Sequence, residues 1–117
     1  MKQLLIPAVA LALSVCGQAH ADSIYCTGSV ANVLLYGDGY LMITASYRGD
    51  YTTLCSVQQT RNGIDPTTCW GWYSVAMTAK KEAKSVTINY NDPSAVSCST
   101  LPTYGAAPAP VYVMINQ

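Results

Sequence analysis

Four cysteines are the feature that most constrains this chain: Cys26, Cys55, Cys69 and Cys98 are spread over the residues that follow an N-terminal leader. The gaps between them are 28, 13 and 28 residues, no C-x-x-C pair occurs, and the only histidine, His20, lies in the leader. These spacings fit no zinc-ligand pattern, so we expect no metal site. An even number of cysteines in a small exported domain indicates disulfides, and four cysteines allow three connectivities.

Residues 1–21 have the features of a cleavable export signal. A basic start is followed by an apolar run over residues 4–15, and an A-x-A processing motif ends at Ala21. The apolar run is shorter than the roughly 20 residues that a membrane span needs. We expect export to the periplasm or the medium, with a single domain over residues 22–117 and no membrane span. A lipid-modified Cys16 and a retained N-terminal anchor are the alternatives.

The charge pattern gives no support to a nucleic-acid partner. The chain has six basic and six acidic side chains and a net charge of zero. A protein that binds nucleic acid needs a basic face to displace counterions from the phosphates. Only Lys80, Lys81 and Lys84 cluster, and they lie near a predicted helix C-terminus, where they oppose the negative end of the helix dipole. No glycine-rich phosphate loop is present, so we expect no nucleotide cofactor.

Hydrophobic periodicity predicts the elements in the order β-β-β-α-β-β. The predicted strands cover residues 24–35, 40–47, 51–57, 85–90 and 111–115, and the predicted helix covers residues 66–84. Turns are expected at residues 37–39 and 48–50, where glycine and aspartate cluster. Asp65 can cap the helix, and Pro66 suits its first position. The proline-rich segment 94–110 has little periodicity and is too long for an ordinary connection, so it is either functional or pinned by Cys98.

This element order predicts a mainly β fold with one helix. It is the order of a five-stranded antiparallel OB-like barrel, and the alternative is an α+β sandwich in which the helix packs on an antiparallel sheet. Barrel topology would place the start of the first strand beside the end of the fourth, which brings Cys26 near Cys98. Cys55 on the third strand could then reach Cys69 in the first helical turn. We therefore predict the pairs Cys26–Cys98 and Cys55–Cys69.

Two resemblances add to this interpretation. The export signal, the cysteine spacing and the segment Cys98-Ser99-Thr100-Leu101-Pro102-Thr103-Tyr104 resemble small exported bacterial proteins of uncharacterised families. The β-β-β-α-β-β order over residues 22–117 resembles the B subunits of bacterial AB5 toxins, which are OB-fold pentamers that bind glycans. The second resemblance implies a toxin-subunit-like or envelope-associated binding protein. It is a resemblance of architecture, so it assigns no role to any residue.

The sequence offers little for catalysis. Without a histidine after the leader, Ser–His and Cys–His nucleophile pairs are excluded. The aspartates occupy predicted turn or cap positions that account for them: Asp38, Asp50, Asp65 and Asp92. We expect a protein that is not an enzyme and has no cofactor. The alternative is a small secreted hydrolase or effector that uses these carboxylates.

Tyrosines near predicted turns are the one affirmative indication of a binding surface. The chain has nine tyrosines and no phenylalanine; Tyr36 and Tyr40 flank the first turn, and Tyr104 lies in the proline-rich segment. Aromatic side chains at such places stack on sugar rings or anchor interfaces. Tyrosine also suits strands and fills core space where phenylalanine is lacking. The expected partner is a glycan or a protein, and the sequence leaves an oligomer open.

Overall fold

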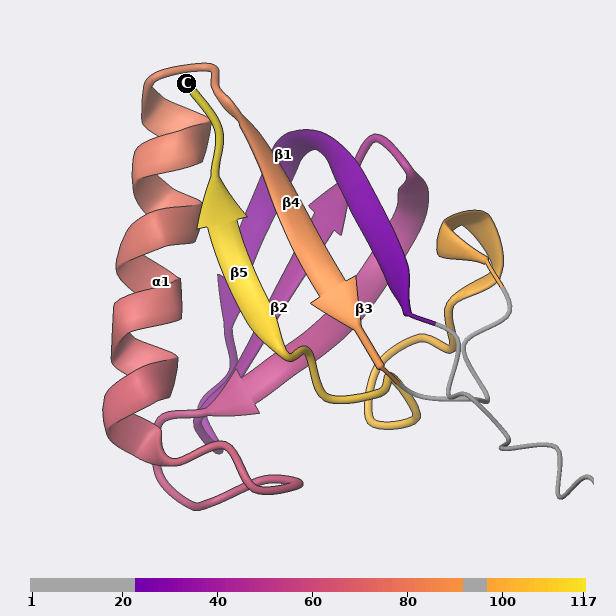
Figure 1. Ribbon diagram of the computed structural model, residues 1–117. Coiled ribbons are helices and arrows are strands. Elements are labelled where there is room, and N and C mark those ends of the chain that lie inside the picture. Colours follow the sequence, from indigo (N-terminus) through magenta and orange to yellow (C-terminus); the bar gives the residue numbers. More distant parts are fainter. Residues whose placement is uncertain (1–22, 92–96) are drawn as a thin grey trace, which may run out of the picture.

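A computed structural model of the chain describes residues 23–91 and 97–117 (Figure 1). Within these residues lie five strands, one α-helix and one 3-10 turn: β1 (Ile24–Leu35), β2 (Tyr40–Ala45), β3 (Arg48–Ser56), α1 (Pro66–Lys81), β4 (Ser85–Tyr90), η1 (Cys98–Thr100) and β5 (Tyr112–Ile115). The predicted export signal and Asp92 lie outside the described residues. None of the helices in the described part is long and apolar enough to cross a membrane.

The strands form one antiparallel sheet in the order β3-β2-β1-β4-β5. The long strand β1 belongs to both halves, because residues 24–29 pair with β4 and residues 30–35 pair with β2. The register with β2 shifts between Val30 and Asn32, and an extra residue of this kind bends a strand. Figure 1 shows β1 curving over from β4 toward β2. The bend gives the sheet two halves, with the helix beside them.

The sheet is not closed into a barrel within the described residues, because β3 and β5 are its two edges. Residues 101–104 of the proline-rich segment lie along β3 instead of a pairing strand. The Arg48 Nε donates to the carbonyl of Leu101 at 3.0 Å, and the backbone N–H of Tyr104 donates to the carbonyl of Tyr51 at 2.8 Å. The fold is therefore mainly β with one helix and an open antiparallel sheet, which fits the α+β alternative.

The second predicted turn is wrong, since residues 48–50 belong to β3. The chain turns earlier, at Ser46 and Tyr47, so that Ala45 pairs directly with Arg48. The reason lies on the neighbouring strand, where Gly28 lets the turn approach closely. A Cβ atom at Gly28 would lie 2.3 Å from the Ser46 Oγ and 2.9 Å from the ring of Tyr47. The bare backbone of β1 thus leaves room for the turn at Ser46 and Tyr47.

The predicted bounds of β1 and β4 agree with the structure, whereas the helix ends three residues before its predicted end. Its start is as expected, because the Asp65 carboxylate accepts the backbone N–H of Thr68 at 2.8 Å. This bond lowers the pKa of Asp65. At the other end, Ala83 adopts a left-handed φ of 53°, a conformation that stops a helix.

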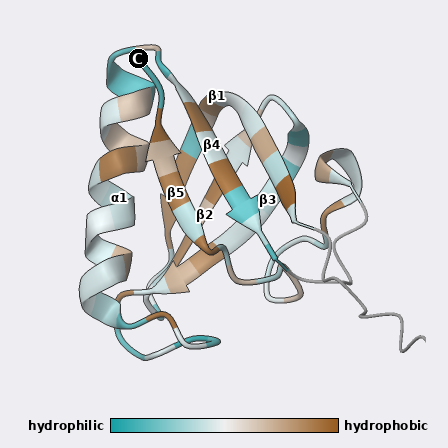
Figure 2. Cartoon of the chain, in the orientation of Figure 1, coloured by the Kyte–Doolittle hydropathy of each residue, from teal (hydrophilic) through white to brown (hydrophobic). Residues whose placement is uncertain are grey.

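The helix packs its small and aromatic residues on the sheet. The buried helical residues are Cys69, Trp72, Ala76 and Ala79. They meet strand residues that alternate between apolar and polar along β4, a pattern that can be followed in Figure 2. The largest side chain with no exposed surface is Tyr90, at the end of β4. Trp70 is on the outside, with half of its surface exposed, and packs edge-on against Tyr73.

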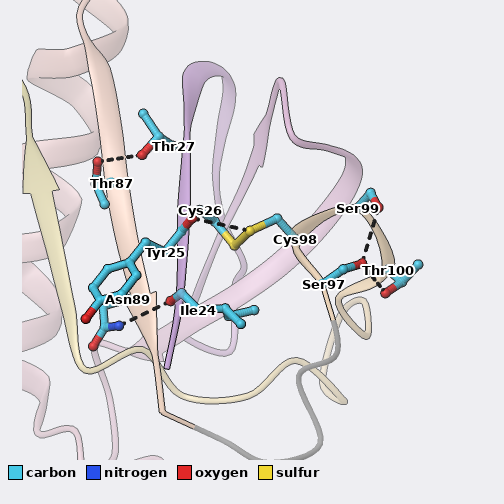
Figure 3. The surroundings of a disulfide bond; sticks show 10 residues. All are labelled: Ile24, Tyr25, Cys26, Thr27, Thr87, Asn89, Ser97, Cys98, Ser99 and Thr100. Atoms are coloured by element: carbon cyan, nitrogen blue, oxygen red, sulfur yellow. Dashed lines mark hydrogen bonds between the residues drawn. A yellow bond between two sulfur atoms is a disulfide. The ribbon is translucent and has the colours of Figure 1, made fainter. Parts of the chain in front are cut away.

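The described residues contain two disulfides, and they join the pairs that the element order predicts. Cys26 on β1 is bonded to Cys98 at the start of η1, and Cys55 on β3 is bonded to Cys69 in the first turns of α1. Figure 3 shows the first bond tying η1 to the start of β1. It anchors one end of the proline-rich segment. Two disulfides fit an extracellular or periplasmic protein.

Candidate binding site

The outer face of the β1–β2–β3 half of the sheet, opposite the core, carries the candidate site. Along β2, Leu41 and Ile43 belong to the core, so the alternation of side chains places Met42 and Thr44 on the other face. The Asn32 side-chain amide donates to the Thr44 hydroxyl at 2.9 Å, which puts Asn32 on this outer face too. Met42 is nevertheless only 5% exposed. Other side chains therefore cover this face.

Tyr51 and Tyr104 form an aromatic pair on this side. Thr52 pairs across the sheet with the core residue Ile43, so the alternation of side chains places its neighbour Tyr51 on the outer face. The rings of Tyr51 and Tyr104 have centroids 6.2 Å apart and are tilted by 45°. This separation lies within the range of favourable aromatic pairs. Tyr104 keeps 44% of its surface exposed, so the pair is open to a ligand.

The backbone of Tyr104 is held in an unfavourable conformation. Its φ is 51°, in the left-handed region that bulky residues rarely adopt. Its N–H donates to the carbonyl of Tyr51 at 2.8 Å, and its carbonyl accepts the Thr53 hydroxyl at 2.6 Å. A short parallel bridge to Thr52 belongs to the same contact. Such strain persists only where the surroundings enforce it, and it concentrates at functional sites.

Asp50 and Tyr36 complete the group. The carboxylate of Asp50 raises the pKa of the Tyr104 hydroxyl, and partial burial and the nearby Tyr36 add to the shift. Asp50 itself accepts the backbone N–H of Tyr51 at 2.7 Å. Tyr36 is exposed over 45% of its surface. We call Tyr36, Tyr51, Tyr104 and Asp50 the outer tyrosine cluster; it offers aromatic rings, protonated hydroxyl donors and one carboxylate acceptor.

The structure separates the predicted site residues. Tyr36 lies near enough to Tyr104 to help raise the pKa of its hydroxyl, and both belong to the outer tyrosine cluster. Tyr40 is half-buried, and its hydroxyl accepts the side-chain amide of Gln59 at 3.2 Å. It also lies near Arg61, in the loop between β3 and α1. Tyr40 therefore belongs to the rim formed by that loop and makes no described contact with Tyr104.

The sequence did not single out Tyr51 and Asp50 as site residues. Tyr51 was available from the sequence only through its place beside the predicted turn at residues 48–50. Asp50 was assigned to a turn that the structure places elsewhere. The contact with Tyr104 joins residues more than fifty positions apart, and no local pattern encodes it.

The acidic residues have local structural roles. Within residues 23–91 and 97–117 no three histidine, cysteine or acidic residues are grouped as metal ligands. Each described aspartate accepts a backbone N–H: Asp38 from Tyr40, Asp50 from Tyr51 and Asp65 from Thr68. Glu82 pairs with Lys84 at 3.3 Å on the surface. Of these carboxylates, Asp50 is the one that raises the pKa of the exposed Tyr104.

Comparisons of the chain with protein-family models, with curated proteins and with solved structures give no match. The function therefore has to be argued from the site itself.

Proposed function

We propose that this chain is an exported, non-catalytic binding protein whose outer tyrosine cluster binds a glycan. The observation that carries the proposal is the enforced left-handed backbone of Tyr104, which holds its exposed ring 6.2 Å from that of Tyr51. A strained residue that presents an aromatic ring to solvent contributes nothing to the core. Strained backbone of this kind is common at sites that bind ligands.

The chemistry of the cluster suits a neutral sugar. The flat C–H face of a sugar ring stacks on tyrosine, while its hydroxyls need both donors and acceptors. Tyrosine hydroxyls donate, since the pKa of Tyr104 is raised, and the Asp50 carboxylate accepts. A few polar groups among aromatic rings are typical of small-molecule sites. The negative charge of Asp50 disfavours an anionic ligand.

The architecture gives separate support. We propose that the fold is an OB-like barrel opened between β3 and β5, because the strand pairing and the position of the helix follow the OB order. The resemblance to the glycan-binding B subunits of AB5 toxins then extends from element order to strand pairing. The two disulfides fit an oxidising compartment, which supports export.

A glycan array probed with the disulfide-bonded protein tests the proposal. Tyr104→Ala and Tyr51→Ala should each weaken binding to the selected glycan at least tenfold, or about 1.4 kcal/mol. The matched control is Tyr25→Ala, because Tyr25 is 61% exposed on the half of β1 that pairs with β4, away from the cluster. That variant should bind like the unchanged protein.

Three results would contradict the proposal. Loss of binding in Tyr25→Ala would move the site to the other half of the sheet, where β1 pairs with β4. Capture of a protein partner with no glycan bound would replace the ligand class. Hydrolysis of a bound glycan that Asp50→Asn abolishes would make the chain an enzyme.

A further inference from the structure

A groove lies between α1 and β1, on the side of the sheet that the helix covers. It has a volume of about 410 Å³ and is lined by Val33 from β1 and by Met77, Lys80 and Lys81 from α1. This volume lies in the range of roughly 300 to 1,000 Å³ that is typical of small-molecule sites. Val33 packs against the core, and Met77 has 43% of its surface exposed. The groove therefore combines apolar side chains that are open to solvent with two amines.

The apolar surface continues from the groove along the helix. Residues three and four positions apart are neighbours on a helix surface, so Tyr73 and Trp70 precede Met77 on the same flank. Trp70 has half of its surface exposed, and its ring packs edge-on against that of Tyr73 with the centroids 5.8 Å apart. From Trp70 to Lys81 the helix rises by roughly 16 Å. A narrow apolar strip of this length suits an extended chain better than a compact ligand.

The end of this strip is positively charged. Lys80 and Lys81 lie in the last turn of α1, and both line the groove. Among the described residues, the salt bridge that forms joins Lys84 to Glu82 at 3.3 Å, so no carboxylate of this part of the chain neutralises the two groove lysines. The helix C-terminus carries only about half a negative elementary charge, which is less than the two positive charges of the lysines. The groove is therefore apolar along its length and cationic at one end.

We propose that this groove binds a free fatty acid. Its carboxylate pairs with the ammonium groups of Lys80 and Lys81, and its chain lies along Met77 toward Tyr73 and Trp70. Charge complementarity selects an anionic head, and the narrow apolar strip selects a single chain. A peptide strand is a poorer occupant, because β1 lies in the middle of the sheet and pairs with β2 and β4, so it offers no edge for strand addition. The groove shares no residue with the outer tyrosine cluster, so this proposal is independent of the glycan site.

Calorimetric titration of the disulfide-bonded protein with dodecanoate, below its micelle concentration and at neutral pH, tests this inference. Acetate has the same head without the chain, and dodecyltrimethylammonium has the same chain with the opposite charge; each should bind at least about tenfold more weakly than dodecanoate. The double variant Lys80→Gln with Lys81→Gln should weaken dodecanoate binding at least about tenfold, and Met77→Ser should weaken it as well. These side chains are exposed, so the variants should fold like the unchanged protein.

The matched control is Lys84→Gln, since Lys84 lies just after the same helix but pairs with Glu82 and does not line the groove. Its variant should bind dodecanoate like the unchanged protein, whereas Lys81→Gln, which removes the same charge, should bind several-fold more weakly. Equal weakening in both would mean a general charge effect. Equal binding of dodecyltrimethylammonium would mean that the lysines do not select the ligand, and binding only to micelles or anionic vesicles would make the strip a membrane-contacting surface. Loss of dodecanoate binding in Tyr104→Ala would place the chain in the outer tyrosine cluster. Each of these results overturns the proposal, as does the absence of dodecanoate binding.

Discussion

The outer tyrosine cluster and the core around Tyr90 use the same side chain in opposite environments. Tyr36 and Tyr104 are 45% and 44% exposed, whereas Tyr90 is fully buried. The pKa of Tyr104 is raised chiefly by a neighbouring carboxylate, and the pKa of Tyr90 is raised by burial. In a chain without phenylalanine, tyrosine is both the large core residue and the exposed aromatic residue. Its role is decided by the place to which the fold brings it.

One segment connects the two regions. Between residues 101 and 107 the chain presents Tyr104 to the outer face, while the carbonyls of Gly105 and Ala107 accept hydrogen bonds from Arg61, which lies near enough to Tyr90 for the phenol to influence its pKa. Cys98 fixes the beginning of this segment to β1. The difference between the two regions therefore depends on the anchoring of a segment without regular structure. Variants that remove this anchoring test its role directly.

The largest effect is expected from removal of the Cys26–Cys98 disulfide. Cys26→Ala with Cys98→Ala opens a loop with a sequence separation of 72 residues and should lower the free energy of unfolding by about 4 kcal/mol. Cys55→Ala with Cys69→Ala opens a separation of only 14 residues and should cost about 3 kcal/mol. Denaturant titration measures both. Only removal of the Cys26–Cys98 bond should also abolish ligand binding at the outer tyrosine cluster. An equal loss of binding in both double variants would show that this bond is not needed to hold the proline-rich segment.

The next effect compares one tyrosine from each region. Tyr90→Ala removes a ring with no exposed surface and should lower the free energy of unfolding by about 3 kcal/mol. Tyr104→Ala removes an exposed ring and should change it by less than about 0.5 kcal/mol. Both values follow from urea titrations of the two variants. A Tyr104 variant as unstable as the Tyr90 variant would make Tyr104 a structural residue and remove the reason for a binding role.

Alkaline pH should lower the free energy of unfolding through the buried tyrosines Tyr47 and Tyr90, by smaller amounts than the preceding changes. The pKa of Tyr47 and of Tyr90 is raised above the ordinary value of 10 in the folded state, so the folded state binds more protons than the unfolded state above pH 10. Their contribution to stability is complete below pH 10 and falls as the pH rises further. The slope is up to about 1.4 kcal/mol per pH unit for each residue.

Tyrosinate absorbance checks this expectation. The two buried tyrosines should ionise only as the protein unfolds, and Tyr47→Phe with Tyr90→Phe should flatten the loss of stability above pH 10. Ionisation of all tyrosines in one step before unfolding would show that Tyr47 and Tyr90 are accessible to solvent.

The fold was predictable where local patterns decide it. The alternation of Val86, Ile88 and Tyr90 set the bounds of β4, and Asp65 with Pro66 set the start of the helix. The second turn was not predictable, because its place depends on Gly28, a residue eighteen positions away that leaves room for Ser46. Among the described residues the sheet is open, and residues 101–104 contact the edge of β3 in a way that no local pattern encodes.

The candidate site was predictable only in part. Tyr36 and Tyr104 were found because aromatic residues near turns are a local signal. Their partners Tyr51 and Asp50 come from a strand that the sequence started three residues too late. The groove between α1 and β1 left no signal, because Val33 and Met77 are ordinary residues until the fold brings them together. Composition showed that tyrosine was abundant, but only the sheet divided it between surface and core.

The smallest effect on stability is expected from a change at Tyr40, whose environment is intermediate between surface and core. It is half-buried, and its hydroxyl accepts the amide of Gln59 near the surface, at 3.2 Å. Tyr40→Phe removes that bond and should lower the free energy of unfolding by less than about 0.5 kcal/mol, because the groups regain hydrogen bonds to water. Glycan affinity should be unchanged, since Tyr40 makes no described contact with the outer tyrosine cluster. Calorimetry measures the glycan affinity, with Gln59→Ala as the control. A tenfold loss of affinity in Tyr40→Phe, with unchanged binding in Gln59→Ala, would make Tyr40 part of the site and extend the site across the first turn.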